Sequence, residues 1–180
     1  MNDRLIFRDA RVEELDKISE LIRRSFWQYQ RQFPQDAWKV YLESITDIRS
    51  RLDKSQLIVS EVGTKLAGTV TLYMNAKDSD ESWPEGWAAI RLLAVDPQCR
   101  RLGIAKALIE ECLQRCRKWG IATVGLHTSE IMSVAVQMYE NMGFVRAPEF
   151  DFHPRPGVIV MAYRLNLGEG KKPANLETGT

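Results

Sequence analysis

The most informative segment of this chain is Val95-Asp96-Pro97-Gln98-Cys99-Arg100-Arg101-Leu102-Gly103-Ile104-Ala105-Lys106. An apolar run over 88–95, interrupted only by Arg91, ends at Asp96-Pro97, and a strongly patterned helix begins at about Gly103. The first N–H groups of a helix have no partner within the helix, and the helix dipole favours negative charge there. A strand, a basic loop and a helix N-terminus in this order therefore predict an anion site.

The basic side chains of the loop agree with this prediction. Arg100, Arg101 and Lys106 gather at the positive end of the helix, where each unpaired cation is unfavourable by roughly 0.3 kcal/mol or more. A basic loop is more often simply solvated, but three cations at this place favour a bound polyanion. The spacing is neither that of a Walker loop nor that of a Rossmann fingerprint.

The composition is that of one globular domain with a sizeable core, because 44% of the 180 residues are hydrophobic and 27% are charged. We expect this domain to span 1–167 and the polar tail 168–180 to be disordered. The net charge of +1 argues against nucleic-acid or membrane-surface partners. An odd number of cysteines, three, favours a reducing compartment, and the cytoplasm is the expected location.

Hydrophobic periodicity predicts the remaining elements. The predicted strands are 5–8, 56–62, 66–74, 87–95, 121–127, a strand beginning at 144, and 158–165. The predicted helices are 12–26, 36–52, 103–119 and one capped at Thr128 or Ser129 that runs to 142. The segments 75–86 and 151–157 are predicted loops. Cys112 and Cys116 lie on the apolar stripe of their helix, so they are expected to pack in the core and not to bind a metal.

Two motifs carry a resemblance to a known family. They are Arg100-x-x-Gly103-x-Ala105 and Ala135-x-x-x-Tyr139-x-x-x-Gly143-Phe144, about 40 residues further on. Together they resemble the signatures of the GNAT superfamily of acyl-CoA-dependent N-acyltransferases. The resemblance implies an α/β (α+β) fold with a mixed, mostly antiparallel twisted sheet and helices on both faces. It also implies a V-shaped splay between two central parallel strands, here 87–95 and 121–127.

The resemblance further implies where acetyl-CoA binds. Backbone groups of Leu93, Ala94 and Val95 would pair with the pantetheine amides. The pyrophosphate would lie on backbone N–H groups of Arg101, Leu102, Gly103, Ile104, Ala105 and Lys106, with the side chains of Arg100, Arg101 and Lys106 as auxiliary cations. Ser133, Val136 and Tyr139 would face the thioester. No metal is implied.

Tyr139 is the predicted catalytic residue. Acyl transfer to an amine expels the CoA thiolate, and a tyrosine hydroxyl near the sulfur can protonate it, an assistance of about 10²–10⁴-fold. Packing in the core is the alternative role of Tyr139. The expected reaction moves an acetyl group to a primary amine by direct attack in a ternary complex. A catalytically silent acyl-CoA-binding regulatory or sensor domain is the alternative.

The general base stays open at the level of sequence. Many relatives carry a glutamate on the strand before the loop, where this chain has Arg91. The candidates are Glu61, Glu149, Asp151, His153 or a water chain. Arg91 itself is expected either to select a substrate carboxylate, on the same strand face as Ala89 and Leu93, or to pair with an acid such as Glu85.

Two departures from the family pattern concern the cofactor. Arg101 replaces a common glycine, which the backbone tolerates if φ is negative there, and Met132 stands seven residues before the tyrosine, where an asparagine is frequent. Reduced affinity for the cofactor is the expected consequence. The acceptor amine, whether of a small molecule, a peptide or a protein, and the formation of a homodimer are left open.

Overall fold

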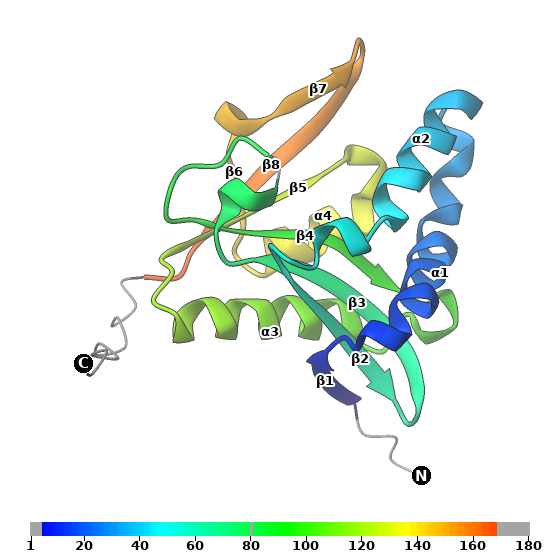
Figure 1. Ribbon diagram of the computed structural model, residues 1–180. Helices are drawn as coiled ribbons and strands as arrows, with labels where there is room; N and C mark the ends of the chain where they lie inside the picture. Colours follow the sequence, from blue (N-terminus) through cyan, green and yellow to red (C-terminus); the bar gives the residue numbers. More distant parts are fainter. Residues whose placement is uncertain (1–4, 80, 169–180) are drawn as a thin grey trace.

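The computed structural model describes residues 5–79 and 81–168, which form one sheet covered by helices (Figure 1). The strands are β1 (Leu5–Asp9), β2 (Gln56–Val62), β3 (Lys65–Tyr73), β4 (Ala88–Val95), β5 (Thr123–Thr128), β6 (Val145–Arg146), β7 (Phe152–Arg155) and β8 (Val158–Asn166). The α-helices are α1 (Leu15–Phe26), α2 (Gln35–Thr46), α3 (Ile104–Lys118) and α4 (Ser133–Asn141).

Short 3-10 helices join these elements. They are η1 (Val12–Glu14), η2 (Trp27–Gln32), η3 (Arg49–Arg51), η4 (Ala76–Ser79), η5 (Pro97–Cys99), η6 (Glu130–Met132) and η7 (Pro148–Phe150). The predicted tail lies almost wholly outside the described residues. No helix among the residues that the structure describes is long and apolar enough to cross a membrane.

The sheet has the strand order β1-β2-β3-β4-β5-β8-β6, and β7 pairs with β8. The pair β4 and β5 is parallel, whereas the other recorded pairs are antiparallel. Figure 1 shows β4 and β5 close together at their N-terminal ends and diverging toward their C-terminal ends. The predicted mixed, mostly antiparallel sheet is confirmed.

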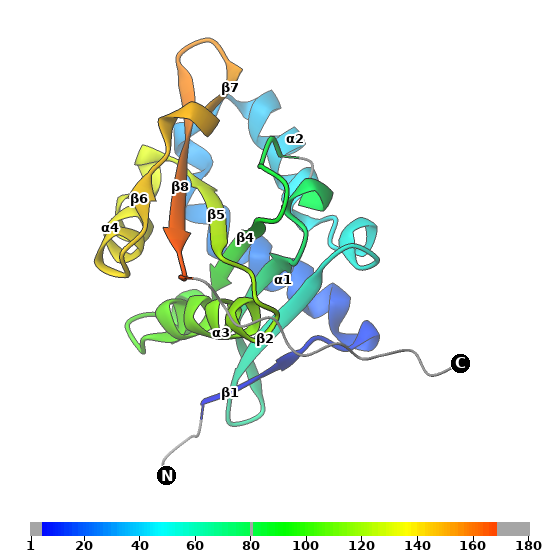
Figure 2. The same cartoon turned by 90° about the vertical axis from the view of Figure 1, so that its left-hand side faces the viewer.

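The helices cover both faces of the sheet, as predicted (Figure 2). The apolar stripe of α1 is buried with that of α2 against Leu57, Val59 and Ala94 on one face. On the other face, α3 and α4 share a core with Ile58, Ile90 and Leu126. Each fully buried apolar side chain contributes about 1.5–3 kcal/mol, so these two layers hold the sheet in place. Cys112 and Cys116 lie in the second layer, fully buried, which confirms their predicted packing.

Several predicted boundaries are wrong. The predicted helix 36–52 is too long. The α-helix α2 ends at Thr46, and the 3-10 helix η3 follows after a short break. Of the two expected caps, Thr128 belongs to β5, whereas Ser129 is the N-cap of η6, without a side-chain hydrogen bond, and α4 begins only at Ser133. The expected loop 151–157 contains β7, which pairs back onto β8 as a hairpin with Gly157 at a φ of 77°.

Candidate active site

A β-bulge in β4 produces the divergence of the two parallel strands. Thr69 and Thr71 of β3 face Ala94 and Arg91, so Val70 alone stands opposite two residues of β4. One of these two, Leu92, has a φ of 53°, the left-handed conformation that marks an extra residue. The pairing of β4 with β5 ends at Ile90 and Leu126, immediately before the bulge. Beyond that pair the two strands separate.

The bulge also changes which side of the sheet the side chains of β4 face. Arg91 and Leu92 lie on the face of α1 and α2, whereas Leu93 packs in the core under α3. The expectation that Arg91 shares a face with Leu93 is therefore wrong, because strict alternation fails across a bulge. Arg91 does share its face with Ala89.

The loop after β4 is fixed by the buried carboxylate of Asp96. It accepts a 2.9 Å hydrogen bond from the Gln98 N–H and pairs with Arg24 at 2.9 Å and Lys65 at 3.5 Å. Burial disfavours its charged form, but these donors and cations together lower the pKa of Asp96. The ion pairs of Asp96 thus connect the start of the loop between β4 and α3 to α1 and to the β2–β3 hairpin.

The tip of this loop has two residues in the left-handed region. Arg101 has a φ of 65° and Gly103, the N-cap of α3, has a φ of 75°. The condition under which the backbone would tolerate an arginine without strain, a negative φ at this position, is therefore not met. The loop keeps the backbone turn that a glycine would favour, and the arginine is held there at a cost of roughly 1–2 kcal/mol.

The three predicted cations have different surroundings. Arg100 donates to the Ser25 carbonyl oxygen at 3.1 Å and to Gln28 at 3.2 Å, so it joins the loop to the end of α1. Lys106 lies 3.6 Å from Glu110 one turn along α3. It also lines a surface groove of about 350 Å³ between α3 and α4, together with Val134, Gln137, Met138, Asn141 and Met142. Arg101 and Leu102 are exposed.

The other predicted cofactor contacts lie on the two sides of the splay. The backbone N–H of Val95 donates to the Ser25 hydroxyl at 3.3 Å. Ser133 at the start of α4 is exposed, and Val136 packs against the core under the sheet. Their roles toward a cofactor stay predictions.

Tyr139 is buried, with 6% of its surface exposed, in the same core layer as Ile90 and Leu126. Its ring packs edge-on against Phe144. Burial raises the pKa of Tyr139 above its usual 10.0, and the hydroxyl of Tyr29 and the thiol of Cys112 raise it further. The phenol is therefore protonated at neutral pH, which is the state an acid requires.

The side chains proposed as bases lie in other surroundings. Glu61 pairs with Arg8 at the β1–β2 edge, and Glu149 lies 3.3 Å from Arg164. Asp151 accepts two hydrogen bonds from Arg146 and one from the Ala162 N–H. These bonds, Arg146 first, lower the pKa of Asp151, although burial opposes them.

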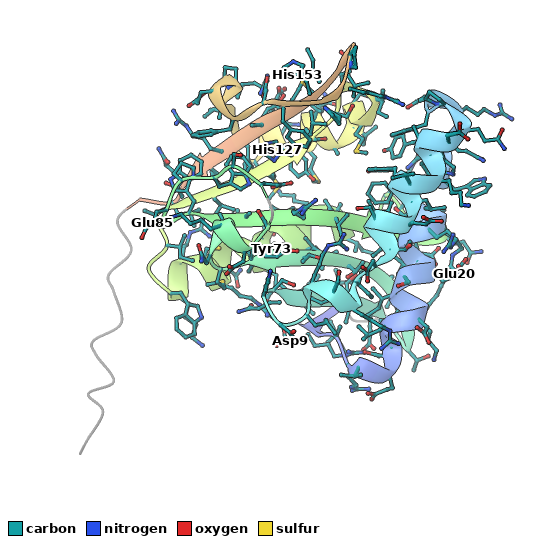
Figure 3. All side chains as sticks on the ribbon, turned by 45° about the horizontal axis from the view of Figure 1, so that its top comes forward. Asp9, Glu20, Tyr73, Glu85, His127 and His153 are labelled. Atoms are coloured by element: carbon teal, nitrogen blue, oxygen red, sulfur yellow. The ribbon has the colours of Figure 1, made fainter. Side chains whose placement is uncertain are left out.

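His153 is exposed on β7. Figure 3 places it on the hairpin above the sheet, away from His127. The structure therefore does not gather these four candidates at the splay.

An acid that the sequence reasoning missed pairs with Arg91. Glu81 Oε1 lies 3.1 Å from Arg91 Nε, and Glu81 Oε2 lies 3.1 Å from His127 Nδ1. Arg91 also donates to the Ser79 carbonyl oxygen. The expected partner Glu85 pairs instead with Lys77 at 2.9 Å. Arg91 thus uses Nε and Nη1 on protein oxygens, and its selection of a substrate carboxylate stays a prediction.

Glu81 itself is buried and ionised. Burial disfavours its charged form, but His127, Arg91 and the Trp83 N–H hold the pKa of Glu81 below its usual value. Such a carboxylate is a weak base. No sequence motif marks Glu81; His127 could have been noticed as a histidine at the end of a predicted central strand.

Aromatic side chains close the other face of the splay. Phe33 stacks on Tyr41 at 5.0 Å and lies 5.5 Å from Trp38. Leu92 of the bulge and Met132 of η6 pack on the same cluster, so residues from both sides of the splay meet there. Trp27, Tyr29 and Phe33 thus form a hydrophobic cluster with the ends of α1 and α2.

The comparison with known proteins decides the family. A profile of the acetyltransferase (GNAT) family matches residues 15–144, well over half of the chain. The chain belongs to this family. Both GNAT motifs, 100–105 and 135–144, lie within the matched range, which also includes both strands of the splay.

Individual GNAT relatives match over shorter stretches. The [ribosomal protein bS18]-alanine N-acetyltransferase of Escherichia coli K12 is 31% identical over 80 residues, 42% of this chain and 54% of that protein. Human N-acetyltransferase 8B is 41% identical over 61 residues, 34% of this chain and 27% of that protein. The chain therefore spans about half or less of the length of these relatives.

Solved GNAT structures share the fold. The PaiA N-acetyltransferase of Thermoplasma acidophilum, in complex with coenzyme A, has a TM-score of 0.68 at 18% identity and covers 88% of this chain and 98% of that one. A GNAT acetyltransferase of Brucella melitensis, in complex with acetyl-CoA, has a TM-score of 0.63 at 17% identity over 96% and 94%. The GNAT fold is thus shown, and known members of the fold bind CoA.

Proposed function

We propose that this protein transfers an acetyl group from acetyl-CoA to a primary amine by direct attack in a ternary complex. The observation that carries the proposal is the separation of β4 from β5 beyond Ile90 and Leu126, next to the N-terminus of α3, in a chain of the GNAT family. A thioester is already activated, so the reaction needs no covalent acyl-enzyme. The chain's task is to hold two substrates and to assist the leaving thiolate.

The loop 101–106 and α3 would hold the pyrophosphate, because Gly103 caps the helix and the first helical N–H groups point toward the loop. The backbone of β4 from Leu93 to Val95 would lie along the pantetheine arm. The neutral amine nitrogen would attack the thioester carbonyl carbon and form the C–N bond. As the C–S bond then breaks, Tyr139 would be the acid that gives its proton to the CoA sulfur. The amine nitrogen would lose a proton to water, and the Tyr139 phenolate would regain one from water.

Tyr139→Phe tests the catalytic part of the proposal. We expect the turnover number to fall at least tenfold, with little change in CoA affinity, because the substitution removes the acid and keeps the ring. Thiol release from acetyl-CoA measures turnover, and calorimetry with CoA measures affinity. Val134→Ala, an exposed change on the same helix, is the matched control. An unchanged turnover number in Tyr139→Phe would contradict the role.

The acceptor is best sought among amines of different size. The names of the relatives include an enzyme that acts on the alanine of ribosomal protein bS18 and a mycothiol acetyltransferase. A panel should therefore contain a peptide with an N-terminal alanine, a peptide lysine and small amines. We also propose a reducing, cytoplasmic location, since Cys99, Cys112 and Cys116 are buried and unpaired. A homodimer stays a prediction.

A catalytically silent acyl-CoA sensor is the second candidate. It is favoured by the ion pairs of Glu61, Glu149 and Asp151, whose carboxylates are engaged by Arg8, Arg164 and Arg146. Tight binding of acetyl-CoA without thiol release on any amine of the panel would favour the sensor. Thiol release that depends on an amine would favour the enzyme.

A further inference from the structure

The loop before β4 brings Glu81 to the point where the two parallel strands separate. Ile90 and Leu126 are the last paired residues of β4 and β5, and Arg91 and His127 are the next residues along each strand. Glu81 contacts both of these side chains. We call Glu81, Arg91 and His127 the Glu81 cluster; Figure 3 shows His127 in the middle of the molecule and Glu85, of the same loop, at its edge.

The Glu81 carboxylate joins the strands with both of its oxygens. Oε1 lies 3.1 Å from Arg91 Nε on β4, and Oε2 lies 3.1 Å from His127 Nδ1 on β5. The side chains of Glu81 and His127 are only 8% and 6% exposed. Buried charges of this kind are strongly held because water cannot replace the partner.

The His127 ring has a protein oxygen close to each of its nitrogens. Nε2 lies 2.9 Å from the Phe150 carbonyl oxygen, which can only accept, so Nε2 carries a hydrogen. Nδ1 lies within ion-pair distance of Glu81 Oε2 but outside hydrogen-bond geometry. The His127 ring is thus held between β5, η7 and the loop of Glu81.

Trp83 fixes the loop that carries Glu81. Its N–H donates to Glu81 Oε2 at 2.7 Å, and its ring lies 4.4 Å from the His127 ring. The ring lies so close to Gly125 of β5 that an added Cβ would be 2.8 Å from it. The Glu81 cluster is thus attached rigidly to both strands.

We propose that Glu81 is a positioning residue that sets the separation of β4 and β5 at the closed end of the splay, and thereby restricts the acyl group to the size of acetyl. This inference rests on the proposed cofactor site. It assigns Glu81 no contact with a proton in transfer. Its action passes through Arg91 and His127 to the two strands.

The direction of the cofactor supplies the reason. With the pyrophosphate at the N-terminus of α3, the pantetheine arm runs back along β4 from Val95 toward Arg91, about 13 Å at a strand rise of about 3.3 Å per residue. The thioester then comes to the closed end of the splay, near Ile90, Leu126 and Tyr139, which share one core cluster. A longer acyl chain needs room where the Glu81 cluster holds the strands together.

The test compares the affinities of acetyl-CoA and butyryl-CoA by calorimetry in the absence of an acceptor. We expect the wild type to bind acetyl-CoA at least tenfold more tightly than butyryl-CoA. In Glu81→Gln, which keeps the shape but removes the charge, we expect this ratio to fall at least fivefold. Where thiol release is measurable, the kcat/KM ratio of the two thioesters should fall likewise.

Glu85→Gln is the matched control. Glu85 lies in the same loop and pairs with Lys77, but its side chain is 86% exposed and it contacts neither strand of the splay. The same acid-to-amide change there should leave the acetyl-to-butyryl ratio within twofold of the wild type. Arg91→Lys is the second variant, which serves as the test if Glu81→Gln does not fold. It keeps the charge but loses the forked contact with Glu81 and Ser79, so it should lower the acetyl-to-butyryl ratio as well.

The outcomes separate the two proposals. Binding of acetyl-CoA with no preference over butyryl-CoA, or with a preference that a folded Glu81 or Arg91 variant retains, overturns the role of Glu81 alone. No binding of either thioester overturns the proposed cofactor site and the inference with it. A general loss of stability lowers both affinities together and leaves their ratio unchanged, so it cannot imitate the expected result.

Discussion

At the scale of single residues, backbone conformation and burial decide how well the predicted side chains suit their roles. Arg101 adopts a φ of 65° that glycine would adopt without strain, and Arg100 is used to hold the loop to Ser25. The cations of the loop before α3 therefore also have structural consequences, since Arg100 anchors the loop and Arg101 strains its backbone. Tyr139 is buried, and its proton is retained more firmly than that of a tyrosine in water.

Arg101→Gly and Arg101→Val test the strained loop. Glycine relieves the left-handed strain but gains freedom in the unfolded chain, so the free energy of unfolding should change by less than about 1 kcal/mol. A β-branched residue is worst in this region, and Arg101→Val should cost about 1–2 kcal/mol. Urea denaturation measures both. Leu102→Val, at the exposed neighbour without a positive φ, should cost less than about 0.5 kcal/mol. If Arg101→Val is as stable as the wild type, the backbone at this position is not strained.

The pH dependence of acetyl transfer tests the role of Tyr139. The acid acts in its protonated form, and burial raises its pKa above the usual 10.0. Activity that depends on this proton is therefore present at all lower pH values and is lost only as the pH rises through the raised value. We expect no alkaline decline of the turnover number below about pH 10. A decline centred below that pH, absent from Tyr139→Phe, would show that the phenol titrates earlier.

At the scale of elements, the separation of two strands depends on one bulge and on one loop. The extra residue at Leu92 turns β4 away from β5, and the packing of Leu92 on the aromatic cluster holds it there. Segment 81–83 lies against β5 because Gly125 leaves room for the Trp83 ring, which also contacts Trp87 and Phe150. Gly125 thus allows the Trp83 ring to approach the backbone of β5 closely.

Gly125→Ala should displace Trp83. The new Cβ would lie 2.8–2.9 Å from three ring atoms, and the ring is buried among other aromatic groups and has little space to retreat. We expect a loss of about 1–3 kcal/mol in the free energy of unfolding, with a change in tryptophan fluorescence. Thr123→Ala, on the same strand but with a solvent-exposed hydrogen bond, is the control and should cost less than about 1 kcal/mol. Equal stability of the two variants would mean that the Trp83 ring moves freely.

At the scale of the whole molecule, the chain is held together across the sheet by ion pairs as well as by its two apolar layers. At the β1–β2 edge, Arg8 binds both carboxylate oxygens of Glu14, at 2.8 and 2.6 Å, and also Glu61. This group joins the start of the chain to a strand about fifty residues further on. The edge of the sheet is therefore sensitive to acid.

The stability of the protein should fall in acid partly through Glu14. The hydrogen bonds from Arg8 lower the pKa of Glu14 from 4.5 to about 2, although burial opposes them. A carboxyl with a depressed folded-state pKa stabilises the fold above pH 4.5, and this contribution is lost as the pH falls toward 2. Urea denaturation at several pH values measures the free energy of unfolding. Between pH 4.5 and 2, this free energy should depend less steeply on pH in Glu14→Gln than in the wild type. The same change at exposed Glu13 should leave the slope as in the wild type.

The amino-acid sequence alone was enough to predict the order of the main elements except β7, the loop before Gly103 and the position of Tyr139 on a helix that ends just before Gly143. These features are recorded locally, because burial periodicity and the glycines that end helices depend on neighbours within a few residues. The resemblance of the two motifs to the GNAT family supplied the splay between β4 and β5, and the structure confirmed it.

Which charged groups meet depends on the folded chain and could not be predicted from the sequence. The bulge at Leu92 reversed the expected face of Leu93, and Glu81, with no motif to mark it, took the place expected for Glu85. The φ of Arg101 and the engagement of Arg100 were likewise settled by the packing of the loop on α1. Ion pairs between distant segments depend on strand register and on the path of a loop, and neither is written in the spacing of residues along the chain.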